Sequence, residues 1–71
     1  MKKRYQAVAI DREHYKNHWE YIALVHDRTG KDGLFQYGFY DMSKTAVIKE
    51  LRAKGIEVSK HVENGGELRL V

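Results

Sequence analysis

The segment that most restricts the fold is residues 19–26, WEYIALVH, in which both alternating sets of positions are largely apolar. One set consists of Trp19, Tyr21, Ala23 and Val25, and the other includes Ile22 and Leu24. A strand that is apolar on both faces is typical of the interior of a sheet. We therefore expect a central strand here, with other strands pairing on either side.

Two neighbouring strands are predicted. Residues 4–10, RYQAVAI, alternate in the manner of a short strand, whereas residues 11–18, DREHYKNH, are polar and read as a loop or a helical turn. On the other side, residues 27–33, DRTGKDG, contain two glycines that can take positive φ. They are expected to join the central strand to a third strand, residues 34–42, LFQYGFYDM, as a hairpin.

One helix is predicted from Ser43 to Lys54. Ser43 is a suitable N-cap, Gly55 suits the C-terminal cap, and between them Val47, Ile48 and Leu51 form one apolar stripe. This is the most strongly signalled element of the chain.

The remaining tail, residues 56–71, is predicted to form two strands around Asn64, Gly65 and Gly66. A three-residue loop would place Val62 opposite Leu68, so that apolar residues share one face. The fold class expected is therefore α+β, as a single basic domain over residues 1–71. Its sheet is small and antiparallel, in the order strand-strand-strand-helix-strand-strand, and one helix packs on one face.

Composition limits the chemistry that the chain can carry. It has 71 residues, no cysteine, and thirteen Lys and Arg against ten Asp and Glu, with a net charge of +3 and a pI near 9.3. Without cysteine there is neither a disulfide nor a thiolate metal site. A basic balance favours anionic partners, although positive charge can also serve solubility alone.

Several functional classes are not expected. The apolar run after the N-terminus is too short for a signal peptide, and no segment is long enough to span a membrane, so we expect a cytoplasmic protein. RTGKDG lacks the full phosphate-binding loop pattern, and neither serine lies in a nucleophile elbow. His14 and His18 would share one side of a helical turn, but no ligand set completes a metal site. We predict no enzyme, metal or cofactor.

The third strand carries Phe35, Tyr37 and Phe39 on alternate positions, so the three rings share one face. They can form the core beneath the helix or an exposed platform, and we expect Phe39 in the core and Tyr37 nearer the surface.

Within this strand, Tyr37, Gly38, Phe39 and Met42 resemble four of the eight positions of the ribonucleoprotein octamer of the RNA-recognition-motif family, whose aromatic residues stack on bases. The eight residues between the first two strands cannot hold the first helix of that family, so no family is assigned.

Nucleic-acid binding is the function that these patterns favour, because cations contact phosphates and aromatic rings stack on bases. Single-stranded or backbone binding is expected. Tyr37 and Phe39, or Tyr5 and Trp19, are the stacking candidates. The expected phosphate contacts are Lys3, Arg4, Arg12, Arg28 and Lys31. The alternative is a protein-interaction module or a homodimer that buries an aromatic patch or a strand edge.

Overall fold

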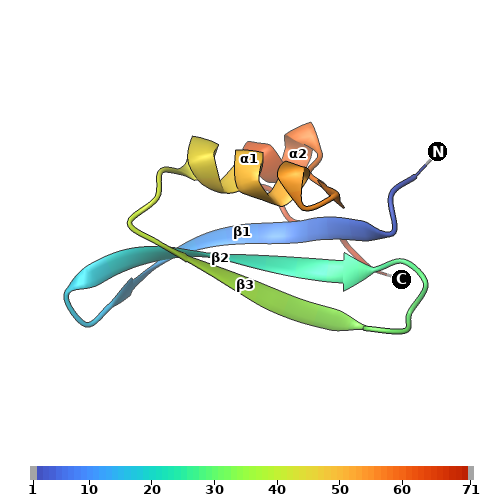
Figure 1. Cartoon of the computed structure of the whole chain (residues 1–71), viewed down its shortest axis with the longest axis horizontal. Helices are drawn as coiled ribbons and strands as arrows, with labels where there is room; N and C mark the ends of the chain where they lie inside the picture. Colours follow the sequence, from blue (N-terminus) through green and yellow to red (C-terminus); the bar gives the residue numbers. More distant parts are fainter. Residues whose placement is uncertain (1, 71) are drawn as a thin grey trace.

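The computed structural model describes residues 2–70, which form a curled four-stranded sheet with the helices on one side (Figure 1). The elements, in chain order, are β1 (Tyr5–Tyr15), β2 (His18–Asp27), β3 (Leu34–Tyr40), α1 (Lys44–Ala53), β4 (Ile56–Glu57) and α2 (Lys60–Glu63). The order across the sheet is β3-β2-β1-β4. The mixed α and β class is confirmed, and so is the central position of β2, which pairs with both β1 and β3.

The hairpin of β1 and β2 is much longer than predicted. Residues 11–15 continue β1 as a paired strand, so the expected loop or helical turn over residues 11–18 is wrong. Only Lys16 and Asn17 form the turn, and Lys16 has the positive φ, 55°, that tight hairpin turns require. We call residues 11–20 the arm. Most of its residues are exposed because it extends past the helices (Figure 1).

The second hairpin and the helix α1 follow the sequence-based prediction. β2 and β3 pair from Glu20 with Tyr40 to His26 with Leu34. The Ser43 side chain accepts a hydrogen bond from the Ala46 amide at 3.2 Å and caps α1. The three stripe residues, Val47, Ile48 and Leu51, are buried.

The C-terminal tail differs from the predicted pair of strands. Ile56–Glu57 forms a two-residue strand parallel to β1, so the sheet is mixed and the expected wholly antiparallel sheet is wrong. The Ser59 side chain then accepts a hydrogen bond from the Val62 amide at 3.2 Å and caps the short helix α2. Val62 itself is fully buried. The predicted second strand of this tail is wrong over its described part, because residues 66–70 form no strand; its last residue, Val71, lies outside the described residues.

After α2, the tail returns to β1 without forming regular structure. The Leu68 amide donates to the Val8 carbonyl at 3.0 Å, at the bulge that shifts the β1–β2 register between Ala7 and Ala9. A bulge releases one residue from its ladder. The tail therefore hydrogen-bonds to β1 at this irregularity.

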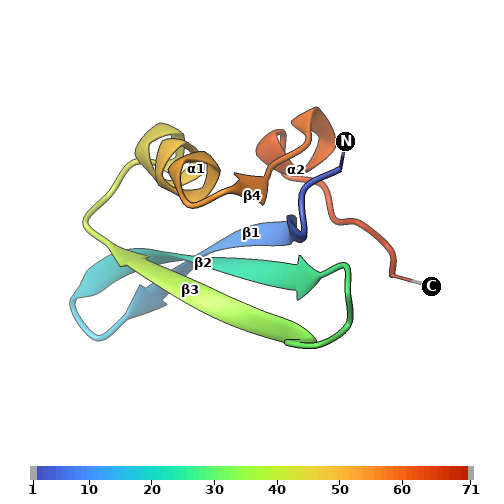
Figure 2. The ribbon, with the colours of Figure 1, turned by 45° about the vertical axis from the view of Figure 1, so that its right-hand side comes forward.

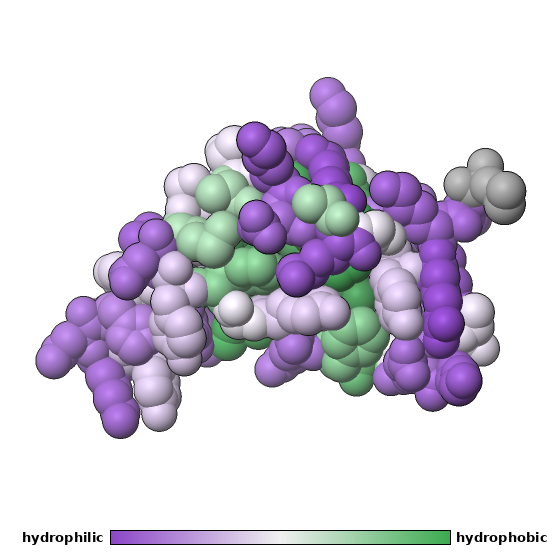
Figure 3. Space-filling view, in the orientation of Figure 1, coloured by the Kyte–Doolittle hydropathy of each residue, from purple (hydrophilic) through white to green (hydrophobic). Residues whose placement is uncertain are grey.

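The core lies between the sheet and the helices, which cover β1 and β4 (Figure 2). Figure 3 shows apolar residues gathered in the middle of the molecule and hydrophilic residues toward both ends. Among residues 2–70, no helix is long and apolar enough to cross a membrane. The buried apolar cluster consists of Ala7, Ile10, Ala23, Val25, Phe39, Val47, Ile48, Leu51, Ile56, Val58 and Val62.

Candidate nucleic-acid interface

The register of the arm brings Arg12 and Trp19 together on one face. His14 pairs with Trp19 and Arg12 pairs with Tyr21, so Arg12 and Trp19 are diagonal neighbours across the hairpin. The Arg12 guanidinium carbon lies 4.3 Å from the centre of the Trp19 ring. Trp19 remains 50% exposed, because the arm extends past the helices. The His14 ring also contacts this indole, with ring centroids 4.8 Å apart. A cation and a half-exposed aromatic ring thus meet at one place.

The opposite face of the arm also has a cation beside an aromatic ring. Tyr15 pairs with His18 across the turn, and the Lys16 Nζ lies 5.6 Å from the centre of the Tyr15 ring. Tyr15 is 53% exposed. The rings of His18 and Tyr40 also meet here, with centroids 4.8 Å apart. Both faces of the arm therefore present cations beside aromatic rings.

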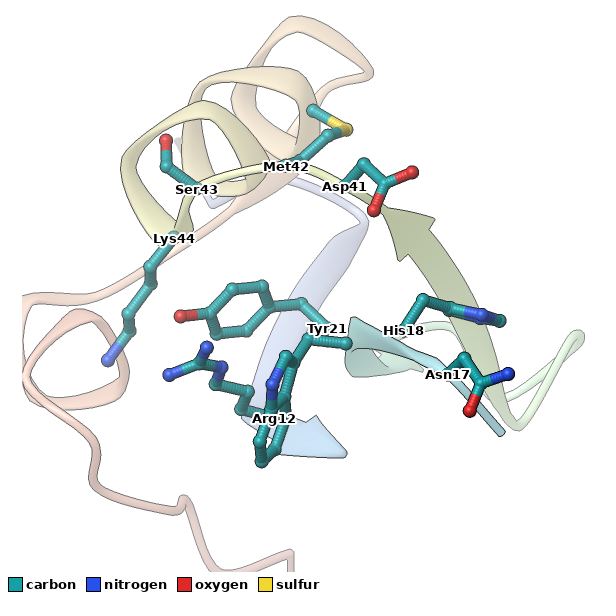
Figure 4. Close-up of a pocket in the computed structure, with 9 residues that line it drawn as sticks. Arg12, Asn17, His18, Tyr21, Asp41, Met42, Ser43 and Lys44 are labelled. Carbon is teal, nitrogen blue, oxygen red and sulfur yellow. The ribbon is translucent and has the colours of Figure 1, made fainter. Parts of the chain in front are cut away.

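An open hollow of about 540 Å³ separates the arm from the segment that joins β3 to α1. Arg12 and Tyr21 line it from the sheet, and Lys44 lines it from the first turn of α1. In Figure 4 the side chains of these three residues extend toward the same side of the hollow, while the Asp41 carboxylate points another way. The hollow therefore joins two cationic groups and a phenol next to the exposed indole.

The cations of the arm are free of structural ion pairs. Within residues 2–70, the basic partners of the ion pairs are Arg4, Arg28 and Arg52. Arg12, Lys16 and Lys44 are not among them. None of these three cations forms a direct ion pair within residues 2–70, so each can contact an incoming anion. Carboxylates do lie nearby: Asp41 lines the same hollow as Arg12 and Lys44, and the arm itself carries Asp11, Glu13 and Glu20.

Two of the predicted phosphate contacts, Arg4 and Arg28, lie at the other end of the sheet and are paired. Arg4 donates to both carboxylate oxygens of Asp27, at 3.0 and 2.9 Å. Arg28 donates to the Glu57 carboxylate at 2.9 Å and to the Lys3 carbonyl at 2.7 Å. The hydrogen bonds from these arginines hold the pKa of Asp27 and of Glu57 below the usual carboxyl range. Both guanidinium groups thus hold strands and loops together.

The other two predicted basic contacts, Lys3 and Lys31, are exposed at that same end, with Lys31 in the loop between β2 and β3. Apart from Tyr37 and Phe39 on β3, the predicted binding residues therefore fall into two groups. Arg12 and Trp19 are brought together on the arm, and the remaining cations are far from them along the 38 Å long axis of the molecule. The binding roles of Lys3 and Lys31 stay predictions.

The aromatic row of β3 belongs mainly to the core side of the sheet. Phe39 is only 8% exposed, so it is not open to stack on a base, whereas Phe35 and Tyr37 are half-buried. This agrees with the expected difference between Phe39 and Tyr37. The Lys54 Nζ of the α1 C-terminal cap lies 5.7 Å from the Tyr37 ring centre. Tyr5 packs edge-on against Phe35 and donates its hydroxyl to Asp32 at 2.8 Å.

The two arm histidines do not form a pair. A helical turn would have placed His14 and His18 on one side, but in the hairpin His18 shares a face with Tyr15 and His14 lies on the other face. No group of three or more His, Cys, Asp or Glu side chains between residues 2 and 70 is placed to hold a metal ion.

Three residues near the arm are not among the predicted binding residues: Tyr15, Lys16 and Lys44. The signal for the first two is the interleaving of cations and aromatic residues over residues 12–19. Lys44 carries no local signal, because its position beside the arm depends on the packing of α1 against the sheet.

No family model, curated protein or solved structure matches this chain.

Proposed function

We propose that this protein is a non-enzymatic module that binds single-stranded nucleic acid through the arm. The observation that carries the proposal is the Arg12 guanidinium held 4.3 Å from the ring centre of the half-exposed Trp19. An aromatic face accepts any base by stacking, and a guanidinium can lie against a ring while its N–H groups point at a phosphate.

The surroundings of this pair support the same assignment. A base stacked on Trp19 would have its backbone next to the hollow, where Lys44 supplies a second cation and Tyr21 a hydroxyl. Neither Arg12 nor Lys44 is committed to a carboxylate among residues 2–70. Phosphate neutralisation by such cations releases counterions, so affinity is expected to fall as salt concentration rises.

The single-stranded form is favoured over duplex because the arm offers ring faces. Stacking on a ring requires a base outside the duplex stack, and each such contact is worth about 1–3 kcal/mol. A duplex would present only its backbone and groove edges to these rings. We therefore expect tighter binding to a single strand than to a duplex of the same sequence.

The test uses fluorescence polarisation of a labelled single-stranded oligonucleotide. Trp19→Leu should weaken binding by roughly 5- to 150-fold, which corresponds to the loss of one stacked base, while Trp19→Phe should retain most of the affinity. Arg12→Ala should weaken binding and reduce the slope of the salt dependence by about one phosphate contact.

Lys31→Ala is the matched control, because it removes one exposed positive charge at the opposite end of the molecule. An arm-centred site predicts only a small effect from it, whereas the sequence-based prediction of Lys31 as a phosphate contact would give a loss like that of Arg12→Ala. An equal loss for Lys31→Ala and Arg12→Ala would contradict an arm-centred site, and unchanged binding in Trp19→Leu would contradict stacking.

A further inference from the structure

The strand β3 leaves one of its edges unpaired. It pairs with β2 on one side, and it is the last strand of the sheet order β3-β2-β1-β4. Figures 1 and 2 show the helices over β1, so the outer edge of β3 is not covered by another element of the described chain. A free edge presents a row of backbone N–H and C=O groups that can accept another strand.

The sequence of this edge lacks the features that usually prevent pairing. Leu34–Tyr40, LFQYGFY, contains no charged residue and no proline, although 32% of the whole chain is charged. Edge strands are normally blocked by lysine, proline or great shortness. At the other edge of the sheet, β4 is only two residues long, so it does fit that rule.

We propose that β3 pairs antiparallel with β3 of a second copy of this chain, around a two-fold axis at Tyr37. In this register all seven residues are paired. Leu34 lies opposite Tyr40 of the second copy, Phe35 opposite Phe39, and Gln36 opposite Gly38. An eight-stranded sheet results, with the helices of both copies on the same side because the axis is perpendicular to the sheet.

The register covers apolar surface on both faces of the sheet. On the face away from the helices, Leu34 and Tyr40 are 52% and 59% exposed, and each would cover the other. On the helix face, the half-buried Phe35 would lie next to Phe39 of the second copy. Cross-strand pairs that involve aromatic residues stabilise antiparallel ladders. A second copy is the favoured occupant because the strand is self-complementary in this register and carries no charge to repel its own copy.

The experiment is sedimentation equilibrium across the micromolar range, without nucleic acid, on the wild-type chain and two double variants. Both variants carry Tyr40→Lys, and they differ only at residue 34. With Leu34→Lys, two lysines would face each other across the interface, whereas with Leu34→Glu each lysine would face a glutamate. Both positions are exposed, and residue 40 lies opposite Glu20 in β2, which tolerates a lysine.

The wild-type chain should sediment at about twice the 8.3 kDa of one copy, the Lys/Lys variant as a monomer, and the Glu/Lys variant again as a dimer. Hydrogen exchange of the wild type should show β3 amides that become more protected as concentration rises. A wild-type chain that is monomeric throughout overturns the proposal, as does a dimer that persists in the Lys/Lys variant. Dissociation of both double variants alike overturns the Tyr37-centred register.

Discussion

The Arg4 guanidinium donates two hydrogen bonds to the buried carboxylate of Asp27 and so joins the start of β1 to the end of β2. Asp27 also accepts from the amide and the hydroxyl of Thr29 and from the amide of Asp32, all between 2.8 and 2.9 Å. One charged group therefore organises the loop that leads to β3.

This arrangement predicts loss of stability in acid. In the folded protein, the hydrogen bonds from Arg4 and Arg28 lower the pKa of Asp27 and of Glu57, so the unfolded chain binds more protons. Their stabilisation is complete above the ordinary carboxyl pKa of about 4 and is lost as pH falls through the folded-state values. Urea unfolding at a series of pH values measures this. The Asp27→Asn variant should be less stable than the wild type at neutral pH, and its free energy of unfolding should fall less on acidification. An unchanged acid dependence in that variant would argue against Asp27 as the main titrating group.

Leu51→Ala should lower the free energy of unfolding by roughly 2–5 kcal/mol, because the side chain is fully buried between α1 and the sheet. Lys49→Ala, on the exposed side of the same helix, should change it by less than about 0.5 kcal/mol. Denaturant titration of both variants checks the orientation of α1. Equal effects would mean that the helix does not bury this stripe.

Phe39 and Tyr37 of β3 should respond differently to alanine substitution in the same measurement. Phe39→Ala should cost about 3–5 kcal/mol, since Phe39 is 8% exposed within the core cluster. Tyr37→Ala should cost less, because Tyr37 is half-buried at the margin of the cluster. If Tyr37→Ala were the more damaging change, the burial order along β3 would be wrong.

Ser59→Ala tests the short helix that replaces the expected strand. Removal of the hydroxyl that caps α2 should cost about 0.5–2 kcal/mol, and Ser59→Asp should retain most of the stability because it can cap in the same way. Thermal unfolding followed by circular dichroism measures both. No difference between the two variants would show that the cap does not contribute.

Local sequence signals were sufficient to predict the elements that carry a pattern of their own. The cap at Ser43, the stripe through Leu51 and the glycine at position 55 predicted α1, and Gly30 and Gly33 marked the loop before β3. In the tail, local signals conflicted. Alternation over residues 56–62 favours a strand, but Ser59 and the positive φ of Gly65 define a short helix, and burial of Val62 stabilises it.

The arm could not be predicted as paired strands, because most of its residues are exposed on both faces of the hairpin. Residues 11–17 are exposed, so they show no apolar alternation, and their order depends on pairing with residues 18–22. For the same reason, the sequence indicated Arg12 and Trp19 as separate candidates, and only the register shows that they touch. The parallel pairing of β4 with β1 joins residues far apart in the chain and leaves no local signal.

The fluorescence of Trp19 tests most directly whether bases stack on this residue, because Trp19 is the one tryptophan of the chain. The unlabelled wild-type protein is titrated with a single-stranded oligonucleotide at low and at high salt. We predict saturable quenching of the indole emission at low salt, and a markedly weaker apparent affinity at high salt, as phosphate contacts require. Emission that does not change at low salt, at oligonucleotide concentrations well above those expected to saturate the arm, would contradict the proposed function.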